Sequence, residues 1–348
     1  MTQPSLAILG WDIGGVNTKA VRVGPDGGAL ALRSLCLPYE LQLDPLSLEP
    51  ALRSAAQQLG ASPADRYHAV TMTAELSQTF RTKREGVGFV LDALQGAFPG
   101  GSLHVYTVTG RFISPREARA QPLDVAASNW AATAQWVAGM VPTCILMDIG
   151  TTTTDLIPIL NGRVAALGRT DAERLLSGEL VYTGALRTPT EAIARRVPLW
   201  GGLARISAEG FALMGDVHLW LDRLQTEEYT CRTPDGRPAT REHAGERLAR
   251  VVCADREMLD EAAIDGIAVA LARAQVLSIV EALKTIRRRH PEIGTAVITG
   301  LGHFIAAEAA QCTGLTVFPL AERLGSAALT APAAAVAWLL RESIAAAG

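Results

Sequence analysis

The chain is poor in lysine, in cysteine and in charge of either sign. Of its 348 residues, 32 are Lys or Arg and 35 are Asp or Glu, so the formal net charge is −3. This balance offers no basic excess for a phosphate backbone and argues against a nucleic-acid partner. Hydrophobic residues make up 49%, which excludes a disordered chain. Only three of the basic residues are lysines, Lys19, Lys83 and Lys284.

Long apolar runs and paired cysteines are also missing. No uninterrupted apolar run approaches the roughly 18–20 residues that span a bilayer. The N-terminal segment MTQPSLAILGWDIGG has no basic residues before its short apolar run, unlike a secretory signal. The five scattered cysteines form no CxxC pair, which argues against a zinc site and for a reducing compartment. These absences predict a cytoplasmic protein without a membrane partner.

The length and the pattern of elements predict two α/β lobes. Residues 1–125 follow the order β-β-β-α-β-α-β, and a second series of strands begins near residue 144. A helix is expected over residues 124–139, and a mainly helical insertion over about 172–290. The last segment, 331–348, is expected to be a helix with its proline in the first turn.

An internal repeat is the most informative feature of the sequence. The segments WDIGGVNTKAVRV at 11–23 and MDIGTTTTDLIPI at 147–159 align without gaps, at an offset of 136 residues. Asp12 matches Asp148, and Thr18 matches Thr154. Each copy predicts a buried strand, a tight glycine turn and a second strand. Two such units indicate a duplicated fold with a central cleft.

The repeated turns are suited to bind phosphate groups. Glycines allow close approach of backbone amides, which form anion-binding arrays together with hydroxyl donors. Asp12 and Asp148 are expected to hold Mg²⁺, largely through water. A purely structural hairpin is the alternative for each turn. The phosphate-binding set is therefore predicted to be Gly14, Gly15, Asn17, Thr18, Gly150, Thr151, Thr152 and Thr153.

Lys19 and Asp155 occupy the same place in the two copies and are candidate catalytic residues. Lys19 either neutralises phosphate or points outward on its strand beside Arg22. Asp155 is a candidate general base or an outer partner of metal-bound water. Asn129 lies in a predicted helix of small residues, where a buried amide needs partners, so a substrate contact is expected there.

At this point the sequence resembles the actin/sugar-kinase/Hsp70 superfamily, in its hydantoinase A/oxoprolinase-like branch. The paired DIGG and DIGT turns look like the two phosphate loops of that superfamily. The segments TMTAELSQTF, KREGV, ASNWAATA, GRTDAERLLSGELVYTGALRTP and RLARVVCADREML narrow the resemblance. Together they look like the branch linked to tetrahydromethanopterin-dependent C1 transfer and methanofuran biosynthesis.

The resemblance implies two ribonuclease-H-like (actin-like ATPase) lobes. The expected bounds are 1–125 for the first lobe and 126–330 for the second, with residues 331–348 packing back on the first. The implied enzyme is a transferase that joins an aminomethylfuran-methyl diphosphate to the phenol oxygen of a γ-glutamyl-tyramine or tyrosine-type acceptor. An aryl ether forms and diphosphate leaves. The rival readings are an ATP-dependent hydantoinase-like hydrolase or small-molecule kinase, and a nucleotide-sensing module without catalysis.

The resemblance also suggests roles for further residues. Glu75 either pairs with the aminomethyl ammonium, accepts the phenol proton or caps the following helix. Glu179 and Tyr182 are expected to line the acceptor pocket. In ITGLGHFIA, Gly300 and Gly302 are separated by Leu301, unlike the adjacent glycines of ATP-using relatives, so ATP binding is not favoured. This segment either contacts the substrate or is a strand-to-helix turn whose glycines allow close packing. The expected partners are small molecules, and a homodimer is compatible with the sequence.

Overall fold

The computed structural model describes residues 6–26, 29–62 and 64–347, which form two compact units. Unit 1 comprises Met1–Thr143, Ile159–Arg174 and Leu320–Gly348, and unit 2 comprises Cys144–Pro158 and Leu175–Pro319. These bounds differ from the expected divisions at 125/126 and 330/331. The helix α4 (Asn129–Ala138) remains in unit 1 because it packs against the C-terminal helix α12 (Ala331–Ala347).

Unit 1 is built on a six-stranded sheet of order β3-β2-β1-β4-β5-β6. β1 pairs antiparallel with β2 and parallel with β4, so antiparallel and parallel halves meet at the central strand. Every residue of β1 is buried, as expected for a strand covered on both faces. The strands are β1 (Ile8–Ile13), β2 (Asn17–Asp26), β3 (Ala29–Pro38), β4 (Tyr67–Met72), β5 (Ser102–Tyr106) and β6 (Phe112–Ile113).

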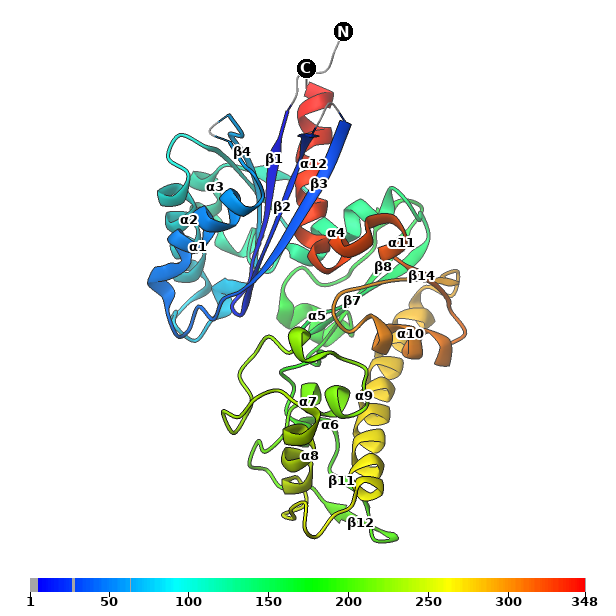
Figure 1. Cartoon of the computed structure of the whole chain (residues 1–348). Helices are drawn as coiled ribbons and strands as arrows, with labels where there is room; N and C mark the ends of the chain where they lie inside the picture. Colours follow the sequence, from blue (N-terminus) through cyan, green and yellow to red (C-terminus); the bar gives the residue numbers. More distant parts are fainter. Residues whose placement is uncertain (1–5, 27–28, 63, 348) are drawn as a thin grey trace. The chain divides into compact units, whose positions relative to one another are not determined.

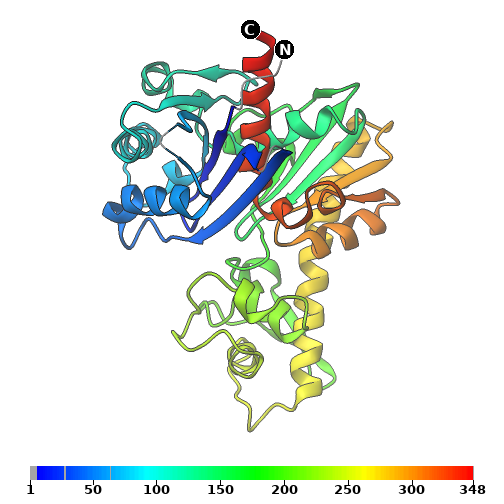
Figure 2. The same ribbon diagram turned by 45° about the horizontal axis from the view of Figure 1, so that its top comes forward.

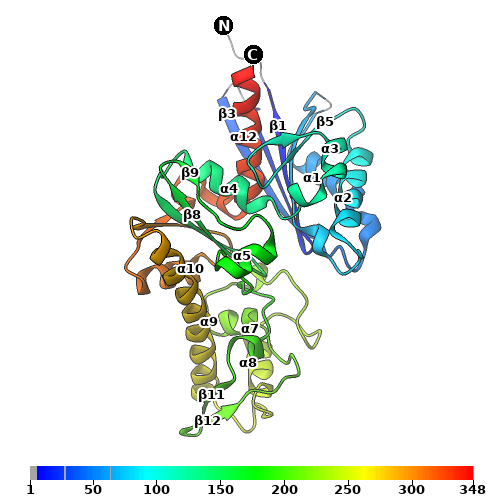
Figure 3. The ribbon, with the colours of Figure 1, turned by 180° about the vertical axis from the view of Figure 1, so that it is seen from behind.

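Helices cover both faces of this sheet. Figures 1 and 3 show α1, α2 and α3 on one face and α4 with α12 on the other. On the first face, Trp11 and Leu9 of β1 share a buried apolar core with Leu52 and Val90. The helices of unit 1 are η1 (Pro45–Ser47), α1 (Leu48–Gln58), η2 (Ala74–Leu76), α2 (Lys83–Ala97), α3 (Pro115–Ala120), η3 (Pro122–Asp124), α4, α11 (Ala321–Leu324), η5 (Gly325–Thr330) and α12.

The expected helix over residues 124–139 begins later than predicted. Residues 125–128 precede α4, and Ala126 forms a parallel bridge with Met72 at the end of β4. Ala127 has a left-handed backbone, with φ at 50°. This long-range pairing holds the segment outside the helix, despite its small helix-forming residues.

Unit 2 repeats the same sheet pattern. Its sheet has the order β10-β8-β7-β13-β14, and β9 pairs with the end of β8 that belongs to unit 1. β7 pairs antiparallel with β8 through the turn of the second repeat and parallel with β13. The two units thus have the ribonuclease-H-like arrangement expected from the repeat. The strands are β7 (Cys144–Ile149), β8 (Thr154–Leu160), β9 (Arg163–Val164), β10 (Leu180–Val181), β13 (Thr295–Thr299) and β14 (Thr316–Pro319).

The insertion of unit 2 is less helical than expected. It contains the hairpin of β11 (Arg196–Leu199) and β12 (Gly202–Arg205) as well as helices and loops. Figure 2 shows α9, in yellow, extending from the sheet of this unit into the insertion. The helices are α5 (Asp171–Ser177), which crosses the unit boundary, α6 (Thr190–Ile193), α7 (Met214–Trp220), η4 (Thr226–Glu228), α8 (Arg241–Arg250), α9 (Glu261–Arg289) and α10 (His303–Cys312).

Two helical stretches are long and apolar enough, by length and composition, to cross a membrane. They are Glu261–Arg289 and Ala321–Ala346, a finding that the sequence analysis did not anticipate. Core helices pass the same test, and 50% and 61% of the two apolar windows are buried inside the protein. Ile264, Leu271 and Ile279 of α9 are fully buried, which is the behaviour of a core helix.

Candidate active site

The first glycine turn joins β1 to β2 in unit 1. The Gly14 amide donates a hydrogen bond to the Asn17 carbonyl oxygen at 3.0 Å, which closes the turn. The carbonyl oxygens of Gly15 and Val16 accept hydrogen bonds from backbone amides of the segment 39–41. Because these carbonyl oxygens already accept hydrogen bonds within the protein, the face of the turn that carries the backbone amides is the one suited to an anion.

The second glycine turn, between β7 and β8 in unit 2, has the same geometry. The Gly150 amide donates to the Thr153 carbonyl oxygen at 2.9 Å, the pair that corresponds to Gly14 and Asn17 at the repeat offset. The carbonyl oxygens of Gly150 and Thr151 accept hydrogen bonds from the amides of residues 185–187. Both predicted phosphate loops therefore direct carbonyls into their own unit.

Gly184 and Gln275 support the second turn and were not anticipated from the sequence. An added Cβ at Gly184 would lie 2.5 Å from the Thr152 nitrogen, so only glycine allows this approach. Gln275 is fully buried, and its Nε2 donates at 2.8 Å to both the Gly184 carbonyl oxygen and Thr183 Oγ1. Gly184 could have been found from its place in the GELVYTG segment, whereas no local sequence pattern indicates a role for Gln275.

Asp12 lies at the end of β1 and faces Lys19 across the hairpin. Lys19 Nζ is 3.6 Å from Asp12 Oδ2, and Thr71 Oγ1 donates to Asp12 Oδ1 at 3.4 Å. Burial raises the pKa of Asp12, and the attraction of Lys19 opposes that rise. Lys19 does not point outward beside Arg22, which instead pairs with Asp65 at 2.8 Å.

Asp148 occupies the equivalent end of β7 and packs against the GLG segment. Gly300 has a φ of +85°, and an added Cβ there would lie 2.5 Å from Asp148 Oδ1. An added Cβ at Gly302 would lie 2.4 Å from the Ile149 side chain. Close packing therefore accounts for both glycines, and a substrate contact by them stays a prediction. Asp155 is buried on β8, opposite Leu180 of β10.

Glu75 follows β4 in η2 and is buried, with 1% of its surface exposed. Lys83 Nζ lies 3.3 Å from Glu75 Oε1 and 3.0 Å from Asp171 Oδ2. Burial raises the pKa of Glu75 to about 7, despite the opposing attraction of Lys83. Glu75 does not cap the following helix, because Thr82 Oγ1 accepts the hydrogen bond from the Glu85 amide at the start of α2.

The other predicted substrate residues lie in different surroundings. Asn129 begins α4 in unit 1. In unit 2 the Glu179 carboxylate is buried, and accepts hydrogen bonds from Ser177 Oγ at 2.8 Å and Arg289 at 3.2 Å. Tyr182 is 57% exposed. The internal ion pair accounts for the burial of Glu179, and its contact with substrate stays a prediction.

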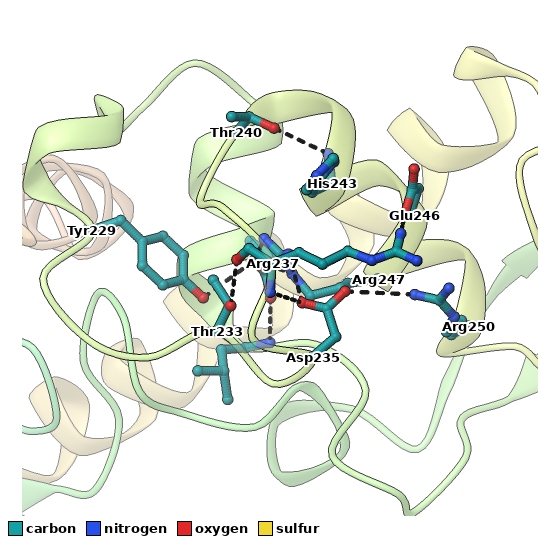
Figure 4. A network of polar contacts seen from close by, with 11 residues as sticks. Tyr229, Thr233, Asp235, Arg237, Thr240, His243, Glu246, Arg247 and Arg250 are labelled. Atoms are coloured by element: carbon teal, nitrogen blue, oxygen red, sulfur yellow. Dashed lines mark hydrogen bonds and ion pairs between the residues drawn. The ribbon is translucent and has the colours of Figure 1, made fainter.

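A second buried ion pair belongs to the insertion. Arg247 pairs with Asp216 at 2.7 Å, and both side chains are fully buried. Figure 4 shows Arg247 beside Asp235 and the phenol of Tyr229; Arg247 is 3.1 Å from Asp235, and Tyr229 donates to Asp216 at 3.2 Å. These contacts join α7, α8 and the loop between them, so the network links separate parts of the insertion. The RLARVVCADREML segment supplies Arg247.

The carboxylates of the turns limit which metal suits them. Among residues 6–26, 29–62 and 64–347, no group of three or more His, Cys, Asp or Glu side chains is placed to hold a metal ion. Each turn contributes one aspartate, Asp12 or Asp148. This donor set suits Mg²⁺, which keeps several waters, and does not suit a transition metal that needs several protein ligands.

Comparisons with known proteins identify a family and two relatives. The profile of the hydantoinase/oxoprolinase family matches residues 66–343. The chain is 38% identical over 341 residues to the (4-{4-[2-(gamma-L-glutamylamino)ethyl]phenoxymethyl}furan-2-yl)methanamine synthase of Methanocaldococcus jannaschii, covering 97% of this chain and 99% of that protein. A protein of the same name from Methanococcus vannielii is 34% identical over 206 residues, covering 58% of this chain and 92% of the relative.

A solved structure supports the fold. The nucleotide-free structure of acetone carboxylase superposes with a TM-score of 0.58 at 12% identity, over 96% of this chain and 70% of that chain. At this identity the likeness concerns the fold alone. It agrees with the repeated sheet pattern of units 1 and 2.

Proposed function

The chain belongs to the hydantoinase/oxoprolinase family, and from this premise we propose that it is a transferase of methanofuran biosynthesis. Its substrates are an aminomethylfuran-methyl diphosphate and the phenol of a γ-glutamyl-tyramine acceptor. The observation that carries the proposal is the 38% identity, over nearly the whole chain, to a synthase whose product is named as a phenoxymethyl-furan methanamine. That product contains the ether bond which the proposed reaction forms.

The reaction balances without a further reactant. The phenol oxygen attacks the furan-bound methylene carbon, and the bond from that carbon to the diphosphate oxygen breaks. Diphosphate leaves with the bonding electron pair, and the phenol proton passes to a base. Because negative charge grows on the leaving group, stabilising that charge lowers the barrier.

The two glycine turns are suited to hold the diphosphate. Their carbonyls are hydrogen-bonded within units 1 and 2, and the Gly14 and Gly150 amides close the turns. The remaining backbone amides and the threonine hydroxyls are the donors that a phosphate needs. Lys19 adds a positive charge beside the first turn. In each unit the aspartate of the turn, Asp12 or Asp148, is the proposed carboxylate ligand for Mg²⁺, which when bound would neutralise further charge on a phosphate group.

Mass spectrometry of the product tests the proposal. The purified protein is incubated with Mg²⁺, the aminomethylfuran diphosphate and γ-glutamyl-tyramine, and the expected products are the aryl ether and inorganic diphosphate. A parallel incubation with Mg-ATP should show no ATP turnover. ATP hydrolysis coupled to a ring-opened or phosphorylated product, with no ether, would favour the hydantoinase-like or kinase alternative and contradict the proposal.

A further inference from the structure

Four segments from three separate regions of the sequence meet in one partly buried cluster of unit 1. Glu75, Lys83, Asp171 and Arg174 form a chain of ion pairs in that order, with distances of 3.3, 3.0 and 2.9 Å. The Arg174 guanidinium then lies over the ring of Trp130, 4.7 Å from its centre. We call these five residues the Glu75 cluster. They come from η2, α2, α5 and α4.

Removing the charged groups of this cluster from water costs free energy, which argues for a role other than stability. Glu75 is 1% exposed and Trp130 and Arg174 are each 2% exposed. Its two acids and two bases balance, but buried ion pairs are often no more stabilising than apolar side chains of similar volume. An independent observation points to a ligand: Glu75 Oε2 is buried and has no hydrogen-bond partner within the described part of the chain, while Oε1 is paired with Lys83.

The unpartnered oxygen belongs to the edge of the sheet that carries the first glycine turn. The Thr73 amide donates to the Ile13 carbonyl oxygen at 2.8 Å, so the chain before Glu75 is bonded to the residue before Gly14. Ser128 Oγ and Trp130 Nε1, at the start of α4, are also buried, and no other described residue forms a hydrogen bond with either atom. Polar groups gathered at the carboxyl ends of parallel strands are typical of a substrate site in α/β folds.

Glu75 is poorly placed to bind the substrate ammonium, because an ammonium of the protein already occupies it. Lys83 pairs with Oε1, and Asp171 fixes Lys83 from the other side. We propose that Glu75 accepts the phenol proton through Oε2, and that Lys83, held by Asp171, is the positioning residue that keeps Glu75 ionised and oriented. This inference rests on the proposed function, since it assigns the base of that reaction.

The proton balance of the step is simple. Glu75 takes the phenol proton as the bond between oxygen and the methylene carbon forms, and it releases that proton to solvent after the product leaves. The charged groups that face Glu75 are Lys83 of α2 and Asp171 of α5, with Arg174 behind Asp171. Lys83 lowers the pKa of Glu75, and both burial and Asp171 raise it, so the group titrates near neutrality. A base is most effective when its pKa lies near the working pH.

The pH dependence of kcat/KM tests the assignment. Activity should rise as Glu75 ionises, at about pH 7. Lys83→Met removes a favourable positive charge and should move the pH at which kcat/KM rises upward by about one to three units. Asp171→Asn removes an unfavourable negative charge and should move it to lower pH. Lys83→Arg should restore most of the parental profile, and Lys284→Met, at an exposed lysine of α9, is the charge-matched control.

The two opposite shifts distinguish a positioning role from a structural one. If Lys83→Met and Asp171→Asn both fold and kcat/KM rises at the same pH as in the parent protein, the proposal is wrong. If Lys83→Met does not fold, the direction of the shift in Asp171→Asn decides. Glu75→Gln should lower kcat by about 10²- to 10⁴-fold. A rise in KM for the aminomethyl substrate alone, with kcat intact, would instead make Glu75 the ammonium partner and overturn the proposal.

A measurement without substrate separates this inference from the proposed reaction. Infrared difference spectra between the parent protein and Glu75→Gln follow the protonated carboxyl band of Glu75 against pH. Titration near neutrality that moves in opposite directions in the two charge variants would support the control of Glu75 ionisation by Lys83 and Asp171. If no ether is formed, the proposed function and the assignment of Glu75 as its base would both be wrong, whereas this control would stand. Ether formation by a Glu75 that stays protonated above pH 8 would keep the reaction and exclude Glu75 as its base.

Discussion

Replacing Gly300 by alanine should disturb Asp148 through a contact that the structure defines. The φ of Gly300 is +85°, and an added Cβ would lie 2.4 Å from the Ile149 carbonyl oxygen and 2.5 Å from Asp148 Oδ1. Real Cβ contacts essentially never fall below 3.0 Å, so the end of β7 must move by about 0.6 Å. The substitution thus pushes directly on the predicted ligand of the second turn.

The expected cost has two parts. A left-handed backbone costs an alanine about 1–2 kcal/mol, and the forced displacement adds about 1–3 kcal/mol, as overpacking does. Gly314 is the matched control, because its φ is +71° and an added Cβ meets nothing within 4 Å. Gly314→Ala should therefore show only the cost of the left-handed backbone, about 1–2 kcal/mol. A displacement on the scale of an ångström at a reacting group costs about 100-fold in rate, so Gly300→Ala should also lose more activity.

Urea denaturation, hydrogen exchange and kinetics together measure this difference. Peptides that contain residues 148–151 should exchange faster in Gly300→Ala than in Gly314→Ala, and the free energy of unfolding should be lower. Equal stability, exchange and kcat in the two variants would refute the inference that Gly300 is a glycine because of its packing against Asp148.

The remaining predictions concern the two turns and the insertion. Asp12→Ala and Asp148→Ala should each lower turnover by at least ~100-fold while the protein stays folded; near-normal kcat with Mg²⁺ in either variant would exclude that aspartate as a metal ligand. Inorganic diphosphate should raise the melting temperature more than ATP, since a ligand at one hundred times its Kd stabilises by about 2.7 kcal/mol; a larger shift with ATP would favour the kinase-like reading. Arg247→Met should destabilise the protein by about 3–5 kcal/mol, because Asp216 is left buried without its cation. The double variant Asp216→Leu/Arg247→Met should recover much of that loss in denaturation experiments, and equal losses in both would show that the pair itself stabilises the insertion.

The two glycine turns could be placed from the sequence because they are local. The hydrogen bonds from Gly14 to Asn17 and from Gly150 to Thr153 each close a turn of four consecutive residues. Glycine and the flanking apolar strands are enough to specify such a turn. The repeat then implied two equivalent sheets, which both units contain. The pairing of Lys19 with Asp12 also follows from the hairpin register, in which the two residues are directly opposite.

The sequence by itself determined the order of the strands, the two glycine turns and the family, because these depend on neighbouring residues and on recurring segments. Tertiary structure decided where the helix before residue 139 begins, since Ala126 pairs with Met72 across the fold. It also decided the environment of Glu75. Lys83 is only eight residues away in the sequence, but Asp171, which fixes it, is 88 residues beyond Lys83. No local propensity determines a long-range ion pair; it arises only when the sheet and its helices have brought the charges together, where burial sets their pKa values.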